Sequence, residues 1–184
     1  MDEDAQLMSA YARGGDVGSL AALVRRHSVW MRAMLRGMVP EADADDVFQD
    51  AWMRVIRSAG SYRGGKVKSY LATVARSAAI DRLRRTRGTV SLDDEEGEGA
   101  SVAAEMASAD VPPDELFESR ATAEDVRRAV HTLPQGQRQV FLMRVEGEMS
   151  YREIAEEMGI PLGTALTWMR SATVKLRKML GGAT

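Results

Sequence analysis

Carboxylates recur at helical spacing between residues 45 and 53, together with an amide and a thioether side chain. Asp46, Gln49, Asp50 and Met53 fall on one helical face, with Trp52 beside it and Asp45 directly before it. Paired carboxylates suit catalysis or a metal site, but His27 and His131 lie far from this segment and no activated nucleophile pattern is present. Two interpretations remain: a surface that docks a protein, and acids that only stabilise a helix N-terminus.

A second cluster combines cations with aromatic side chains. Residues 63–87 carry eight cations against one acid, Asp81. The cations are Arg63, Lys66, Lys68, Arg76, Arg82, Arg84, Arg85 and Arg87, and the neighbouring aromatics are Tyr62 and Tyr70. Cations that follow phosphates, next to rings on which bases stack, are typical of proteins that bind single-stranded nucleic acid. The alternative is the solvated basic end of an amphipathic helix.

The segment from residue 150 to 180 has the pattern of a helix-turn-helix. Ser150 and Glu153 form a capping box, and Gly159 stands where the first helix must end in a left-handed conformation. Residues 160–163 make the turn, and Thr164 is expected to cap the second helix. That helix should direct Ala165, Met169, Ala172, Leu176 and Met179 inward, and Thr167, Arg170, Ser171 and Val174 outward. Such a unit fits the DNA major groove, although a plain helical hairpin gives a similar pattern.

Helical periodicity also runs through the rest of the chain, and no segment alternates long enough to predict a strand. A short helix is expected to end at Gly14–Gly15, and Asp16 should cap the next one, which Pro40 stops. A third helix, capped by Asp43 or Asp45, should reach about Arg57. A loop over 60–65 follows, and further helices are expected over 67–87, near 114–131 and over 135–146. The expected fold class is all-α.

The charge distribution divides the chain into three parts. Residues 1–87 carry a net charge of +5, residues 88–119 carry −10 with no cation, and residues 120–184 carry +3. The acidic part is rich in Gly and Ala and has no clean period, which predicts a flexible linker between two small helical domains. Basic domains on both sides of it favour a polyanionic partner.

Composition narrows the class further. The chain has no cysteine, so disulfides and cysteine metal sites are excluded. It has no long apolar run, and its first residues are acidic, so neither a membrane span nor a signal peptide is expected. The expected location is the cytoplasm, and no cofactor, metal or small-molecule substrate is expected.

The order of these motifs resembles region 2 and region 4 of the sigma factors of bacterial RNA polymerase. For region 2 the resemblance rests on Asp45-Asp46-x-x-Gln49-Asp50, Tyr62-Arg63 and the run from Ala75 to Arg85. For region 4 it rests on Leu133-Pro134, residues 137–142, Ser150-Tyr151-x-Glu153-Ile154-Ala155 and Gly163-Thr164. Two such regions joined by a short linker are the layout of the extracytoplasmic-function (ECF, group 4) sigma factors.

This resemblance implies a role for each cluster. The face with Asp45, Asp46, Gln49, Asp50 and Met53 would bind the clamp helices of the largest polymerase subunit. The minus-ten element would be captured as single strand by Tyr62, Arg63, Lys66, Lys68, Tyr70, Arg76, Ser77, Arg82, Arg84 and Arg85. The minus-thirty-five element would be read by Ser150, Tyr151, Thr164, Thr167, Arg170, Ser171, Val174 and Lys175.

The resemblance also implies the wider setting. The C-terminal domain would hold the flap of the second-largest subunit, and the acidic linker would thread near the polymerase active centre. An anti-sigma factor commonly holds such proteins inactive. The chain would not be an enzyme, because the polymerase performs the chemistry.

Several positions depart from the family pattern. Leu166, Trp168 and Thr173 stand where cations are expected, and each lost phosphate contact weakens DNA binding. Three alternatives are open for Leu166 and Trp168: contact with thymine methyl groups, filling a gap in the domain, or contact with a protein. Packing or a protein contact is favoured for Trp168. In region 2, Ser77 replaces a frequent Asn and Tyr70 a frequent Trp. Alternative functions are a sigma-like adaptor that does not start transcription, a helix-turn-helix repressor and, more remotely, a hydrolase.

Overall fold

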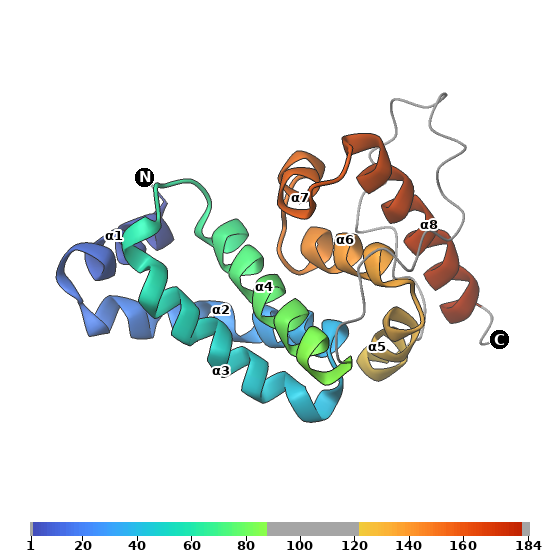
Figure 1. The fold of residues 1–184 in the computed structure, drawn as a ribbon, viewed down its shortest axis with the longest axis horizontal. Helices are drawn as coiled ribbons and strands as arrows, with labels where there is room; N and C mark the ends of the chain where they lie inside the picture. Colours follow the sequence, from blue (N-terminus) through green and yellow to red (C-terminus); the bar gives the residue numbers. More distant parts are fainter. Residues whose placement is uncertain (1, 88–121, 182–184) are drawn as a thin grey trace. The chain divides into compact units, whose positions relative to one another are not determined.

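The structure, a computed structural model, describes residues 2–87 and 122–181, and every regular element in these two stretches is helical. The helices divide into two compact units, α1 to α4 and α5 to α8 (Figure 1). The all-α prediction is therefore confirmed. The predicted linker over 88–119 lies outside the described residues, as do residues 114–121 of the helix expected near 114–131.

The first unit consists of four α-helices and one short 3-10 helix. They are α1 (Glu3–Gly14), α2 (Val17–Met38), α3 (Glu41–Ser58), η1 (Ala59–Ser61) and α4 (Val67–Arg87). Helices α2, α3 and α4 pack against one another, and α1 packs on α2. The part of the loop predicted over 60–65 that precedes Tyr62 belongs to η1.

The N-termini of α2 and α3 test the capping residues predicted from the sequence. Asp16 caps α2 as predicted, because its carboxylate accepts hydrogen bonds from the backbone N–H groups of Gly18 and Ser19 at 3.1 and 3.3 Å. The predicted cap of α3 is wrong. This helix begins at Glu41, directly after Pro40, without a side-chain cap, so Asp43 lies inside its first turn.

Apolar side chains from all four helices form the core of the first unit. Its buried members include Met8, Leu23, Met31, Met34, Leu35, Val47, Phe48, Val55 and Leu71. Trp52, expected beside the acidic face of α3, is instead 6% exposed and packs edge-on against Phe48, with ring centroids 6.4 Å apart. The surface of this face is therefore acidic but not aromatic.

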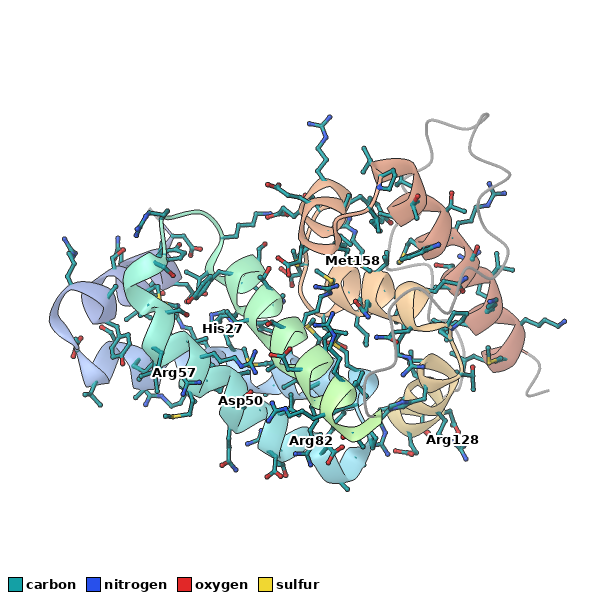
Figure 2. All side chains as sticks on the ribbon, in the orientation of Figure 1. His27, Asp50, Arg57, Arg82, Arg128 and Met158 are labelled. Carbon is teal, nitrogen blue, oxygen red and sulfur yellow. The ribbon has the colours of Figure 1, made fainter. Side chains whose placement is uncertain are left out.

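A buried histidine joins α1 to α2. The indole N–H of Trp30 donates to His27 Nδ1 at 2.9 Å, so the ring proton lies on Nε2, which donates to the Asp4 carboxylate at 2.8 Å. Burial lowers the pKa of His27, against the opposing effect of Asp4. Figure 2 labels this residue. The arrangement fixes a neutral His27 at the centre of the contact.

The second unit contains α5 (Ala123–His131), α6 (Gln135–Val145), α7 (Tyr151–Met158) and α8 (Leu162–Leu180). Helix α8 packs on the other three. Ser150 and Glu153 form the predicted capping box, and Thr122 and Asp125 form a second one. Thr122 caps α5, so this helix begins at Ala123 and gives the described part of the helix expected near 114–131.

The turn between α7 and α8 follows the prediction up to Gly159, which has a φ of 66°. The predicted cap of α8 is wrong, since the helix begins at Leu162 after Pro161 and Thr164 lies within its first turn. Of the residues expected to face inward, Met179 is the exception at 42% exposed. The buried ones are Ala165, Met169, Ala172 and Leu176.

The ring of Trp168 packs against α6 at Gly136. A Cβ atom added at Gly136 would lie 2.4 Å from the Cζ3 atom of the Trp168 ring, so the ring lies directly on the backbone of α6. Only glycine leaves room for this contact. Of the two roles favoured for Trp168, packing within the domain and a protein contact, the structure shows packing.

Candidate nucleic-acid and polymerase interface

The acidic face of α3 lies at the surface of the first unit. Asp45, Asp46, Gln49 and Met53 are exposed, Met53 by 49%, and Asp50 is half-buried. The structure thus brings the five predicted docking residues together on one helix, opposite the buried Phe48 and Trp52. Ile56, one turn beyond Met53 and 37% exposed, extends this face and did not stand out in the sequence.

Two of the acids already have cationic partners. Asp45 forms an ion pair with Arg32, whose guanidinium also lies 3.9 Å from the centroid of the Phe48 ring. Asp50 accepts from Arg54 Nη2 at 2.8 Å, and Arg57 Nη2 lies 3.9 Å from its other oxygen (Figure 2). These pairs fix the carboxylates without removing them from the surface.

Arg54 connects the acidic face of α3 to α4. Besides Asp50, its Nη1 donates to the Asp81 carboxylate at 2.7 Å and to the Ser77 hydroxyl at 3.2 Å. One guanidinium thus positions one side chain of the predicted polymerase face and one of the predicted minus-ten face. The spacing of four residues between Asp50 and Arg54 predicts their pair, but the long-range partners on α4 have no sequence signal.

The loop before α4 is shaped by two glycines and two tyrosines. Gly64 and Gly65 have φ values of 96° and 95°, a region that side-chain-bearing residues rarely adopt. The Tyr62 hydroxyl donates to the carbonyl of Gly65 at 2.7 Å, and the rings of Tyr62 and Tyr70 lie 5.5 Å apart. Both rings are half-buried, so they stabilise the loop as well as lining it.

The cations of this region differ in accessibility. Arg63 and Lys66 in the loop are exposed, as are Ser77, Arg84 and Arg85 on α4. Lys68, Tyr70 and Arg76 are half-buried, and Lys68 Nζ lies 5.2 Å from the centroid of the Trp30 ring. The exposed cations are the part of this cluster that a phosphate backbone can reach directly.

Arg82 is a predicted DNA-binding cation that has an acidic partner within the first unit. It forms an ion pair with Asp43, and their hydrogen bond raises the pKa of Arg82 and lowers the pKa of Asp43. The pair joins the first turn of α3 to the last part of α4. Its local charge is neutral, so Arg82 has a structural role in addition to any contact with DNA (Figure 2).

In the second unit, the predicted DNA-reading residues follow the exposed sides of α7 and α8. Ser150, Arg170, Val174 and Lys175 are exposed, and Tyr151, Thr164, Thr167 and Ser171 are half-buried. Arg144 lies over the Tyr151 ring, 5.2 Å from its centroid. The outward set of α8 is therefore on the surface as predicted.

The three positions that lack an expected cation are not equivalent. Trp168 packs on Gly136, and Thr173 is only 5% exposed, so both belong to the interior of the unit. Leu166 is 40% exposed and is the one of the three that faces outward. The departure at the surface of α8 is therefore concentrated at Leu166.

Two kinds of site are not found in the described residues. Within 2–87 and 122–181, no group of three or more His, Asp or Glu side chains is arranged to hold a metal ion. In the same two stretches, no helix is long and apolar enough to cross a bilayer.

Family models match both units. Sigma-70 region 2 matches residues 23–89, and Sigma-70 region 4 matches residues 123–176. The ECF RNA polymerase sigma factor SigM of Mycobacterium tuberculosis is 31% identical over 182 residues, which cover 97% of this chain and 85% of SigM. The chain belongs to the ECF sigma factors of the sigma-70 family. The two family matches include every predicted interface residue.

Other relatives agree. The ECF sigma factor SigW of Bacillus subtilis is 28% identical over 141 residues, covering 75% of each chain. SigE of Mycolicibacterium smegmatis is 29% identical over 160 residues. The match covers 86% of the present chain but only 60% of the length of SigE.

Two solved structures share the fold. One is described as CnrH in complex with the cytosolic domain of CnrY, with a TM-score of 0.67, 19% identity and full coverage of both chains. The other is the sigma factor RpoE in complex with the anti-sigma factor NepR from Bartonella quintana. Its TM-score is 0.65 at 19% identity, and the match covers 91% of this chain and 100% of that one.

Proposed function

We propose that this sigma factor binds core RNA polymerase through the acidic face of α3 and directs it to promoters by reading two DNA elements. The observation that carries this proposal is the surface exposure of Asp45, Asp46, Gln49 and Met53 on one helix, inside the matched region 2. Such a face suits a cationic partner helix, and the clamp helices of the largest subunit are the proposed partner. The chain itself performs no catalysis.

The loop over 62–66 and α4 are proposed to capture the unpaired minus-ten strand. Exposed Arg63, Lys66, Arg84 and Arg85 would follow its phosphates, while the glycine-shaped loop receives an unstacked base near Tyr62. Stacking of a base on an aromatic ring contributes about 1–3 kcal/mol, which favours the melted over the paired strand. Lys68, Tyr70, Arg76, Ser77 and Arg82 complete this proposed surface.

The second unit is proposed to read the minus-thirty-five element with α8 in the major groove. Its capping box holds α7 at the angle set by the Gly159 turn, and the outward residues Thr167, Arg170 and Ser171 follow from the burial of the opposite face. The same unit is proposed to bind the flap of the second-largest subunit.

Control by an anti-sigma factor is also proposed. RpoE from Bartonella quintana, which has the same fold, was solved in complex with the anti-sigma factor NepR. A bound protein that covers the α3 face or the DNA-reading faces would prevent assembly with polymerase or promoter.

The test of the polymerase contact reverses charge on α3. Asp46→Lys with Asp50→Lys should reduce core binding by about thirtyfold or more, since loss of an interfacial charge partner costs about 2–5 kcal/mol. Because reversal of Asp50 also breaks its pair with Arg54, Asp46→Lys alone serves as a second variant that leaves this pair intact.

The matched control for Asp46→Lys is Glu3→Lys, which makes the same charge change at an exposed carboxylate on α1, outside both proposed polymerase contacts. Binding is measured by co-elution with core polymerase and by titration, and circular dichroism checks that each variant is folded. Undiminished binding of both α3 variants would contradict the clamp contact.

A further inference from the structure

The first turns of α8 present an apolar surface where a groove-reading helix contacts base edges. Leu162 and Leu166 are four residues apart on the helix, and each is 40% exposed. Between them Gly163 contributes no side chain, and nothing lies within 4 Å of the position its Cβ would take. Two leucine side chains are thus neighbours on the open side of the helix start.

The polar side chain beside Leu166 has its donor already in use. The Thr167 hydroxyl donates to the carbonyl of Gly163 at 2.8 Å, so it can only accept a further hydrogen bond. Ala165 and Met169 are buried and Trp168 packs on Gly136, so none of the three shares the outward face. The first cation that follows on this face is Arg170, one turn beyond Leu166.

The chemistry of the major groove decides what such a surface can select. The base pairs present hydrogen-bond donors and acceptors there, and thymine alone adds an apolar group, its 5-methyl. A leucine held against guanine or cytosine covers polar atoms without pairing them, which costs free energy. Against thymine the same side chain buries a methyl group and gains apolar contact.

We propose that Leu166 makes this sigma factor select a thymine in its minus-thirty-five element, through contact with the 5-methyl group. The inference rests on the proposed function, in which α8 reads that element. Leu166 is assigned this role in preference to Leu162 because it lies a full turn inside the helix, adjacent to Thr167 and one turn before Arg170. Leu166 is then a specificity residue in a position where a cation would only add affinity.

The experiment uses holoenzyme assembled from core polymerase and the full chain, on a promoter found by mapping its transcript starts. Each thymine of the minus-thirty-five element is replaced singly by deoxyuridine, which keeps the base pair and removes only the 5-methyl group. At one position this replacement should weaken binding about fourfold, the effect of one buried carbon group. Affinities are measured by competition against the unmodified duplex.

Three variants locate the effect. Leu166→Ala should weaken binding to the thymine promoter and abolish the difference between thymine and deoxyuridine. Leu166→Arg should abolish the same difference and steepen the salt dependence by about one unit, the signature of an added phosphate contact. Met179→Ala, an exposed apolar side chain on the same helix about 20 Å away along its axis, should leave the difference unchanged.

Distinct outcomes overturn distinct claims. A thymine preference that survives in Leu166→Ala, tolerance of deoxyuridine at every position, or an element without thymine would overturn the proposal while leaving the proposed function standing. Weaker core binding by Leu166→Ala, with thymine discrimination intact, would instead assign this face to a protein contact. Absence of any specific transcript start would overturn the proposed function itself.

Discussion

The contact of Trp168 with Gly136 predicts that Gly136→Ala destabilises the second unit. The added Cβ would lie 2.4, 2.6 and 2.9 Å from three carbons of the Trp168 ring, closer than real Cβ contacts allow. Forcing such an overlap costs about 1–3 kcal/mol, and alanine returns roughly 0.5–1 kcal/mol through its higher helix propensity. The net loss in the free energy of unfolding should therefore be about 1–2 kcal/mol.

The assay is hydrogen exchange of α8 peptides in the intact chain, followed by mass spectrometry. A loss of this size should accelerate exchange through unfolding of the unit by about 5- to 30-fold. Gly163→Ala is the matched control, because nothing lies within 4 Å of its added Cβ, and it should be neutral or stabilise by up to about 1 kcal/mol.

The cause is isolated by repeating Gly136→Ala in a Trp168→Leu background. There the overlap is absent, so the substitution should become neutral or stabilising, and the two changes should be coupled by more than about 1 kcal/mol. Exchange in Gly136→Ala that is as slow as in the parent chain would refute the proposed packing of Trp168.

Three further results are expected. The pKa of His27 is lowered in the folded chain, so the unfolded chain binds more protons and stability should fall as the pH drops below about 6.5. His27→Gln should flatten this dependence in thermal melts of the first unit, and an unchanged slope would contradict the assignment. Ser150→Ala removes the cap of α7 and should cost about 1 kcal/mol, seen as faster exchange of α7 amides but not of α2 amides. Arg170→Ala with Ser171→Ala should weaken binding of promoter duplex while sparing core polymerase; equal duplex affinity would remove these residues from the reading face.

Local signals made most helix boundaries predictable from the sequence. Asp16, Ser150 and Gly159 act through hydrogen bonds within three or four residues of themselves, so their effect depends little on the rest of the fold. The predicted caps of α3 and α8 failed for one shared reason. Pro40 and Pro161 occupy the N-cap positions of these helices, and a proline side chain has no hydrogen-bond acceptor, so both helices begin without a side-chain cap.

Burial depth was harder to predict than helical face. Periodicity gave Met179 the direction of the core, but it lies near the end of α8, where 42% of it stays exposed. Trp52 neighbours the acidic face in sequence, yet it reaches the core beside Phe48. Both outcomes depend on which other helices lie alongside, information that a single helix does not contain.

In the candidate interfaces too, some features follow from local sequence and others depend on packing between helices. The grouping of Asp46, Gln49, Asp50 and Met53 follows from helical spacing alone. The pair of Arg82 with Asp43, and the bridge from Arg54 to Asp81, join α3 to α4 across the packed unit and have no signature in either segment. Which cations remain accessible to DNA therefore became visible only in the folded structure.

The most direct test of the central claim is transcription in vitro. Core polymerase is combined with this chain and a pooled library of genomic upstream DNA, and the 5′ ends of the transcripts are sequenced. Discrete starts that share two spaced upstream elements, and that disappear with Asp46→Lys, are expected. Intact core binding without any specific start would contradict the claim and would favour a sigma-like adaptor.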